Sequence, residues 1–158
     1  MRESRFKVVC TDWIRSNPAI IESCDCLRLG LNAEDGAYIV PLNFAYVPGK
    51  PAKFYFHSAK EGRKVDMIGQ GAKAGFELDG AHRLGEAETG CRHTFFYQSV
   101  IGTGTVRPVE TLEEKKRALS AIMAHYRKDC AFSFTDEQAD AVAVFCLTAE
   151  TMSCKQHS

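Results

Sequence analysis

The stretch FYFHSAKEGRKVDMI, residues 54–68, decides the fold of this chain, because a strand pattern changes into a helix pattern within it. Over residues 53–58, aromatic and polar side chains alternate with a period of two, which predicts a strand with one buried face. Ser58 and Glu61 then have the spacing of a capping box, and apolar residues follow at helical spacing. We therefore predict that the strand is followed directly by a helix that begins after Ser58 and ends near Ile68.

Two cations, Arg63 and Lys64, lie in the first turn of this predicted helix. The positive end of the helix dipole disfavours cations at this place, so an anionic ligand, most simply a phosphate, would offset their unfavourable position. The alternative is a basic turn that is solvated, as most surface lysines and arginines are. The spacing of the residues leaves both interpretations open.

The length and composition of the chain predict one globular domain over residues 1–158. Of the 158 residues, 45% are hydrophobic, which is enough for a full core without stabilisation by metal ions or disulfide bonds. Lysine and arginine together number 20, as do aspartate and glutamate, so the chain lacks the strong basic field that nucleic-acid binding needs. The N-terminal residues contain no apolar signal region, and the apolar run at 141–147 is too short to span a bilayer. These observations predict a soluble, cytoplasmic protein that binds neither nucleic acid nor membranes.

Seven cysteines at irregular spacings, without a CxxC pair, predict reduced thiols in a reducing compartment. We expect most of them, Cys91 included, to be small core residues. The same spacings offer no paired metal-ligand motif, so no metal site is predicted.

Other elements follow from hydrophobic periodicity and turn signals. Capping boxes at Thr111 and Thr135 predict a helix that ends near Tyr126 and a shorter helix after it. Pro41 cannot donate to a strand ladder, so the strand that contains it is expected at an edge or with a bulge. Residues 79–92 fit a loop and a strand equally well. The predicted strands cover residues 26–32, 37–47, 53–58, 72–78, 95–109 and 141–147, and a short helix covers 18–23.

Gly102 and Gly104 lie inside the long predicted strand over residues 95–109 and leave one of its faces nearly bare. Glycines at such positions permit sharp coiling of the strand or the close approach of another group. Because the mostly antiparallel strands are accompanied by only a few helices, a closed antiparallel barrel is the expected architecture.

Three segments, taken together and in this order, resemble a known family: VPLNF at residues 40–44, YFHSAKEGRK at 55–64 and YQSVIGTG at 97–104. They are similar to the flavin-binding split-barrel proteins related to pyridoxamine 5′-phosphate oxidase, and most closely to the branch of the 5-nitroimidazole resistance proteins. The resemblance covers roughly residues 24–147. It implies a mainly β fold with peripheral helices, namely a six-stranded antiparallel Greek-key split β-barrel of the FMN-binding type. It also implies a homodimer that holds FMN at its interface.

The resemblance also implies roles for individual residues. Arg63 and Lys64 match the basic pair that holds the FMN phosphate, with Ser58 as a second donor. The strand that ends at Asn43 is expected to lie along the flavin ring, and Asn43 to reach its pyrimidine edge, although a strand-edge asparagine can also bond to local backbone. His57 lies where the ring or the ribityl chain would pass. The complete set of predicted cofactor-binding residues is Val40, Pro41, Leu42, Asn43, His57, Ser58, Arg63, Lys64, Tyr97 and Ser99.

The resemblance further implies an FMN-dependent oxidoreductase that reduces a small nitroaromatic, 5-nitroimidazole-like acceptor, with NAD(P)H as a candidate electron donor. His57 is the expected catalytic residue, either as a proton donor or as a contact to a second ligand. Two alternatives stay open. One is a flavin- or haem-binding protein without turnover, in which His57, His82 or His93 would be the axial ligand of the haem. The other is pyridoxamine-phosphate oxidation itself, which needs a further basic set for the substrate phosphate, and the C-terminal third contains no such cluster.

Overall fold

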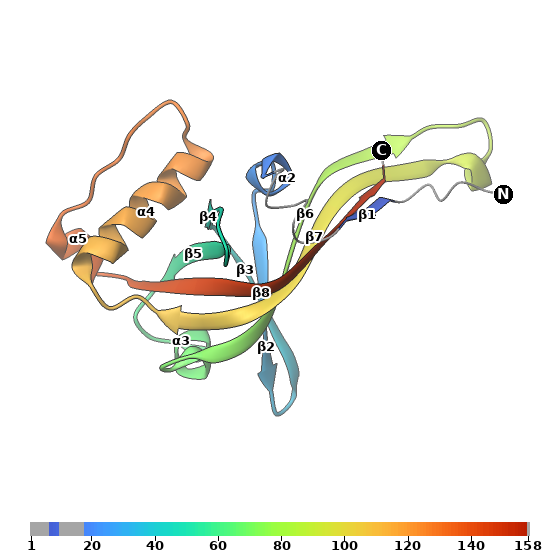
Figure 1. The fold of residues 1–158 in the computed structure, drawn as a ribbon. Coiled ribbons are helices and arrows are strands. Elements are labelled where there is room, and N and C mark those ends of the chain that lie inside the picture. Colours follow the sequence, from blue (N-terminus) through green and yellow to red (C-terminus); the bar gives the residue numbers. More distant parts are fainter. Residues whose placement is uncertain (1–6, 10–17, 158) are drawn as a thin grey trace.

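One antiparallel sheet of eight strands forms the body of the protein (Figure 1). The computed structural model describes residues 7–9 and 18–157, and within them the strand order is β3-β2-β6-β7-β8-β5-β4, with β1 paired to β8. Short helical segments lie around this sheet. The strands are β1 (Lys7–Val9), β2 (Leu27–Ala33), β3 (Gly36–Leu42), β4 (Ala45–Val47), β5 (Lys53–Ser58), β6 (Ala72–Gly85), β7 (Thr94–Pro108) and β8 (Ala143–His157), and the helical segments are α2 (Ala19–Glu22), α3 (Arg63–Ile68), η1 (Gly90–Arg92), α4 (Leu112–Tyr126) and α5 (Asp136–Asp140).

The mainly β class with peripheral helices is confirmed, but the expected count of six strands is wrong. One additional strand arises because the strand predicted over residues 37–47 is divided into β3 and β4 at Asn43 and Phe44. The other is β1, in a region where the sequence pattern predicts no strand. The remaining predicted strands are confirmed, and β6 and β8 continue well beyond their predicted ends at residues 78 and 147.

The break between β3 and β4 closes the sheet into a split barrel. These two strands are the opposite ends of the strand order, yet only Asn43 and Phe44 separate them in the chain. The chain therefore leaves one edge of the sheet and joins the other edge almost at once. Because β3 pairs with β2 and β4 pairs with β5, no ladder among the described strands joins β3 to β5, and the barrel stays open between them.

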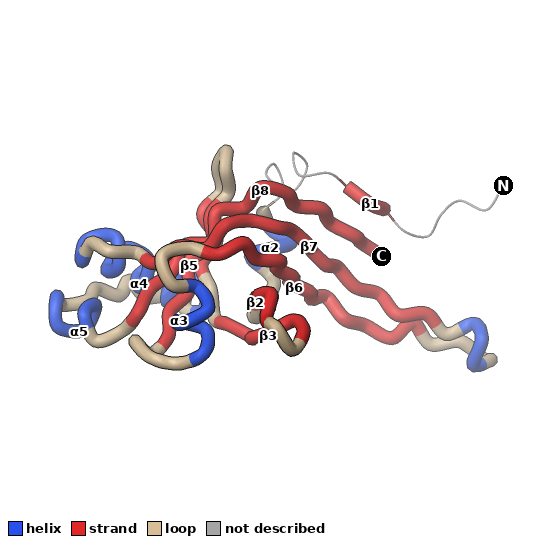
Figure 2. Tube along the Cα trace, turned by 90° about the horizontal axis from the view of Figure 1, so that it is seen from below, coloured by secondary structure: helices blue, strands red, loops and turns tan. Residues whose placement is uncertain are grey.

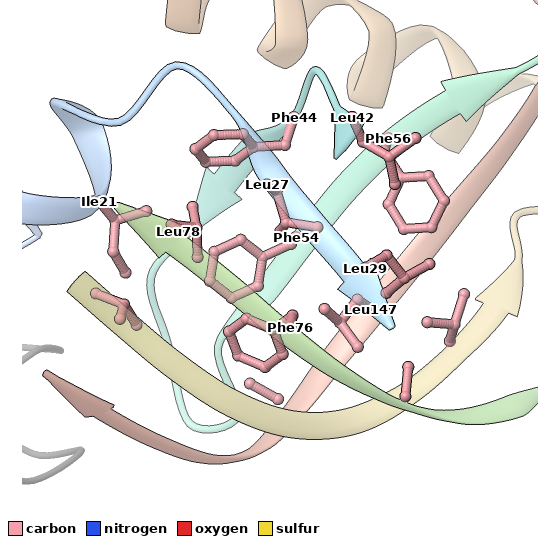
Figure 3. Packing of buried hydrophobic residues seen from close by; sticks show 14 of the residues in the cluster. Ile21, Leu27, Leu29, Leu42, Phe44, Phe54, Phe56, Phe76, Leu78 and Leu147 are labelled. Atoms are coloured by element: carbon pink, nitrogen blue, oxygen red, sulfur yellow. The ribbon is translucent and has the colours of Figure 1, made fainter. Parts of the chain in front are cut away.

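Side chains from alternate positions of the strands fill the interior of the barrel (Figure 3). Leu27 and Leu29 of β2 face inward as predicted, and Phe54 and Phe56 of β5 are fully buried. The Phe54 ring lies 5.0 Å from the ring of Phe76, a spacing typical of favourable aromatic pairs. Each fully buried side chain of this kind contributes about 1.5–3 kcal/mol. The cluster therefore fixes the path of β5, whose end carries the candidate site.

The two glycines of β7 mark a close approach of neighbouring groups inside the barrel. A β-carbon added at Gly102 would overlap the Phe76 ring and the carbonyl oxygen of Thr151. One added at Gly104 would overlap the carbonyl oxygen of Thr148. The interpretation of these glycines as sites of close approach is confirmed.

Gly102→Ala is therefore expected to destabilise the protein by about 1–3 kcal/mol, because the added methyl group overpacks the core. For a domain of this size, the melting temperature falls by roughly 2–4 °C for each kcal/mol. Differential scanning calorimetry measures the change, and Gly90→Ala is the control, since a β-carbon there meets no atom within 4 Å. Equal melting temperatures for the two variants would contradict this account of Gly102.

β6 and β7 extend beyond the barrel as a long antiparallel pair, which Figure 2 shows from below, with η1 at its tip. β6 continues to Gly85, so the undecided stretch at 79–92 is strand over its first half. A register shift against β7 follows Gly80. Of the described residues 81–96, which we call the arm, none is buried, so the alternation that identifies strands elsewhere is missing there. This explains why the sequence pattern does not distinguish loop from strand in this stretch.

α4 and α5 pack on each other and against β5 and β8 through a second, smaller apolar cluster. The Thr135 capping box is complete, whereas at Thr111 only one half forms, with the Glu114 N–H donating to the threonine hydroxyl at 3.3 Å. The Glu114 carboxylate instead accepts from Tyr55 Oη at 3.0 Å. Both predicted helix starts are confirmed. Within the described residues, no helix combines the length and the hydropathy that crossing a membrane requires.

The six cysteines of the described residues are free thiols, and Cys10 lies outside these residues. Cys24 and Cys154 are buried, as expected of core residues. Cys91 and Cys130 are exposed, so the expectation that Cys91 packs in the core is wrong. Its position at the tip of the arm, away from the barrel, is the reason.

Candidate functional site

The junction between β5 and α3 is built differently from its prediction. α3 begins at Arg63 and follows Gly62, whose φ of 121° lies in the region that favours glycine. Ser58 is still paired with Ala143 in the ladder between β5 and β8, and its hydroxyl donates to the carbonyl of the next residue at 2.7 Å. The predicted capping box at Ser58 is therefore wrong, because the ladder keeps this residue in the strand. Arg63 and Lys64 do lie in the first turn of the helix, as predicted.

Lys64 is a partly buried cation that has no carboxylate partner among the described residues. Its side chain is half-buried, and this burial lowers its pKa. Among the described residues, no carboxylate oxygen lies within 4.0 Å of its Nζ atom. A partly desolvated ammonium group is unfavourable on its own, so a bound anion would stabilise this part of the protein.

His57 lies at the end of β5, opposite Val144 of β8. Its surface is mostly exposed, although the surrounding protein partly desolvates the imidazole. This partial burial, and after it the positive charge of Lys64, lowers the pKa of His57. Both effects favour the neutral imidazole, and Lys64 is close enough to influence its charge.

Arg63 contacts the turn between β2 and β3. Its Nη2 atom lies 2.8 Å from Asp35 Oδ1, and its guanidinium carbon lies 4.9 Å from the centre of the Tyr38 ring. Both side chains of the ion pair are more than half exposed, so the pair contributes only about 0–1 kcal/mol. An adjacent cavity of about 410 Å³ is lined by Arg63 and Met67 of α3 and by residues 32–35. A stronger anion can therefore replace Asp35 at the guanidinium group.

The strand expected to lie along a flavin ring is an edge strand. β3 pairs with β2 on one side and ends the strand order. Pro41, opposite Arg28, is exposed, which confirms that it occupies an edge. Asn43 is exposed as well, whereas Val40 is half-buried and Leu42 is buried. Backbone groups along the free side of β3 can therefore form hydrogen bonds with a ligand.

The ladder between β4 and β5 stops short of these residues. Its last pair is Ala45 with Tyr55, and continuing the register by two residues would set Asn43 opposite His57. The barrel thus opens between the end of β3 and the end of β5. We call this opening the split. Asn43 and His57 lie at one end of it, and the first turn of α3 reaches the turn between β2 and β3 at the other end of β3 through Arg63 and Asp35.

Tyr97 and Ser99 do not join this group within one chain. Tyr97 pairs with His157 of β8, whereas His57 pairs with Val144 of the same strand. These two partners are thirteen residues apart, on the order of 40 Å along an extended strand. The two parts of the predicted site are therefore far apart on a single molecule.

Tyr126, near which the predicted helix ends, belongs to the surroundings of the split. Its hydroxyl accepts from the Phe44 N–H at 3.2 Å, next to Asn43. Because Phe44 and Tyr126 are 82 residues apart in the chain, no local pattern reveals this contact. The only sequence signal is a tyrosine at the end of an amphipathic stripe.

The other candidate haem ligands lie on the arm. His82 Nε2 is 3.0 Å from Asp79 Oδ2, and His93 Nδ1 is 3.0 Å from the Thr89 carbonyl oxygen. Both imidazoles are thus engaged with neighbouring groups. In the part of the chain that the structure describes, no group of three or more metal-ligating side chains is present.

Comparison with known proteins finds one matching family. A sequence profile described as pyridoxamine 5′-phosphate oxidase matches residues 18–156. No curated protein matches the sequence.

Several solved structures are similar to this fold. A candidate 5-nitroimidazole antibiotic resistance protein from Bacteroides thetaiotaomicron is 29% identical, with a TM-score of 0.78 and coverage of 96% of this chain and 88% of that one. The FAD and haem binding protein from Mycobacterium smegmatis is 14% identical, with a TM-score of 0.77 and coverage of 98% and 74%. A FAD-binding protein from Mesorhizobium loti is 16% identical, with a TM-score of 0.65 and coverage of 97% and 99%. At these identities, the last two likenesses concern the fold alone.

Proposed function

Because this chain belongs to the pyridoxamine 5′-phosphate oxidase family, we propose that it is an FMN-dependent oxidoreductase whose flavin occupies the split. The observation that carries this proposal is Lys64, a partly buried ammonium group without a carboxylate partner among the described residues, directly beside Arg63 in the chain. A phosphate would supply the missing negative charge. The guanidinium fork and the ammonium point charge together are well suited to hold it.

The other groups at the split fit the chemistry of the flavin ring. The pyrimidine edge of the ring presents an N–H between two carbonyl oxygens, so it needs both acceptors and donors along one line. The free side of β3, from Val40 to Asn43, offers backbone groups of both kinds. Ser58 is the weaker candidate, since its hydroxyl already donates to the carbonyl of the next residue.

The flavin, when bound, supplies hydride and electron transfer. Arg63 and Lys64 would hold its phosphate, and the edge of β3 would orient the ring. His57 is the proposed proton donor to the reduced acceptor, and the lowered pKa makes its protonated imidazole a stronger acid. The protein thus contributes binding, orientation and a proton at the imidazole.

A small nitroaromatic compound of the 5-nitroimidazole class is the proposed acceptor, and NAD(P)H is the candidate donor. The support is the similarity to the candidate resistance protein from Bacteroides thetaiotaomicron. The test is an anaerobic assay with purified protein, FMN, NADH or NADPH, and a 5-nitroimidazole. We expect loss of the nitro absorption only when protein and FMN are both present. Failure to bind FMN would reject FMN as the cofactor. FMN binding without turnover would indicate a flavin carrier.

The second candidate function is haem or flavin binding without turnover. It is favoured by the similarity in fold to the FAD and haem binding protein from Mycobacterium smegmatis. His57 is the candidate axial ligand at the split, because His82 and His93 lie on the arm. The absorption spectrum of untreated protein separates the two cases, since a haem gives an intense Soret band and a flavin does not.

We further propose that the chain acts as a homodimer with FMN at the interface. Tyr97 matches a ligand-contacting position but lies far from His57 along β8, and a second copy can bring its own Tyr97 to the split of the first. The arm also exposes Leu84 and Phe95, which are paired across β6 and β7 and are 50% and 53% exposed. Two large apolar side chains side by side on a projecting arm favour a protein partner.

Mixing two defective variants tests a site that is shared between protomers. One double variant carries Arg63→Ala with Lys64→Ala, and the other carries Tyr97→Ala with Ser99→Ala. We expect each double variant alone to bind FMN poorly. After random reassociation, about half of the dimers are mixed and each has one intact site, so about one quarter of the wild-type sites return. Titration with FMN counts the sites, and sedimentation measures the oligomeric state. A dimer that exchanges its subunits without any recovery of binding would contradict the shared site.

A further inference from the structure

The C-terminal end of α4 holds the chain at the break between β3 and β4. The Phe44 N–H donates to Tyr126 Oη at 3.2 Å, and the same hydroxyl donates to the Asp25 carbonyl oxygen at 2.8 Å. Because the hydroxyl proton is committed to Asp25, a lone pair of the oxygen accepts from Phe44. Tyr126 therefore ties the break to the segment that leads into β2.

The neighbouring residue strengthens the same attachment. His125 Nε2 lies 2.8 Å from the Cys24 carbonyl oxygen, and its ring centre lies 4.4 Å from that of Phe44. The Phe44 side chain is fully buried and points into the core (Figure 3). Phe44 is thus held at its ring as well as at its backbone amide.

This attachment fixes the direction of one backbone carbonyl. The peptide bond between Asn43 and Phe44 is trans, so its C=O points opposite to its N–H. Since the N–H is directed at Tyr126, the Asn43 carbonyl points away from α4. Neither residue belongs to β3 or β4, so no strand ladder fixes the orientation of this peptide. The hydrogen bond from its N–H to the Tyr126 hydroxyl fixes it instead.

We propose that Tyr126 is a positioning residue for the flavin: through the Phe44 amide, it orients the Asn43 carbonyl to accept a hydrogen bond from the N3–H of the flavin ring. This inference rests on the proposed function. N3–H is the single donor on the pyrimidine edge, so an acceptor in a fixed direction selects one orientation of the ring. Without the Tyr126 hydroxyl, the Phe44 N–H loses its partner, and the peptide is free to rotate.

Comparison of FMN with N3-methyl-FMN tests the proposal, because a methyl group then stands in place of the single donor hydrogen on the pyrimidine edge. Dissociation constants are measured by flavin fluorescence for wild-type protein and for Tyr126→Phe, with folding checked by circular dichroism. We expect wild-type protein to prefer FMN about tenfold, the value of one hydrogen bond of ordinary strength. In Tyr126→Phe, the preference is expected to fall to about one, because the carbonyl is no longer held in place.

Tyr55→Phe is the matched control. It removes another tyrosine hydroxyl that connects the sheet to α4, the one that donates to Glu114 at 3.0 Å, and leaves the Asn43–Phe44 peptide untouched. We expect the full preference for FMN in this variant.

The outcomes separate the two proposals. If wild-type protein binds neither flavin, the proposed function fails. If it binds FMN and N3-methyl-FMN equally, or if Tyr126→Phe weakens both to the same degree, the positioning role of Tyr126 is overturned while the flavin site stands.

Discussion

Replacing Arg63 and Lys64 together by alanine is expected to weaken FMN binding by about 3–6 kcal/mol, because each charge-assisted contact with a phosphate is worth roughly 1.5–3 kcal/mol. This corresponds to a loss of affinity on the order of a hundred- to ten-thousandfold. Lys64 is expected to account for the larger share. Its ammonium group is partly buried without a carboxylate partner among the described residues, whereas Arg63 must give up its contact with Asp35. Isothermal titration calorimetry measures both single variants and the double variant.

Two further variants make this test specific. Lys60→Ala removes a nearby exposed cation that pairs with Asp140 at 3.2 Å, and we expect it to change FMN affinity by less than about threefold. Asp35→Asn removes the competitor of the phosphate at Arg63 and should tighten FMN binding by up to about fivefold. Wild-type affinity in the double variant of Arg63 and Lys64 would mean that the phosphate binds elsewhere.

Replacing His57 by glutamine is expected to slow nitro-compound reduction by about a hundredfold or more, the usual contribution of a general acid. Glutamine is similar in size but cannot carry the proton, so FMN affinity should change only a few-fold. The ratio kcat/KM at saturating FMN measures the effect on turnover, and the dissociation constant of FMN is the control. A His57→Gln variant with the wild-type rate would exclude the imidazole as the proton donor.

The pH dependence gives an independent check of the same role. Partial burial and the charge of Lys64 lower the pKa of His57 below its usual 6.5. If the protonated imidazole gives the proton, kcat/KM rises as the pH falls through this pKa, and the rise is absent in His57→Gln. Stability changes in the opposite sense: the folded protein favours the neutral imidazole, so this contribution is present above pH 6.5 and is lost as the pH falls below it. Rates are therefore compared only at pH values where circular dichroism shows folded protein.

Strands that line the barrel are predictable from sequence, because one face must be apolar. The alternation around Leu29 and Phe56 reflects this burial directly. The arm has no buried face, so its strands carry no such signal. Pro41 indicates an edge but not the position of the break, because it stays paired opposite Arg28 and the chain leaves β3 two residues later, at Asn43.

The candidate site is predictable where its residues are contiguous. Arg63 and Lys64 lie in the first helical turn because the helical periodicity starts there. The role of Ser58 is not predictable from the sequence. Its local capping signal competes with the ladder between β5 and β8, and the ladder keeps Ser58 in the strand. The contact of Tyr126 with Phe44 depends on how α4 packs against the barrel, which no local pattern contains.

The projecting residues 81–96 contribute nothing to the packed interior, so selection for a stable barrel leaves their length and composition almost unconstrained. Related chains can lengthen or shorten this segment and keep the same interior. Such changes alter only the exposed surface of the protein. The projection is thus an adjustable spacer, whose length can change in evolution without loss of foldability.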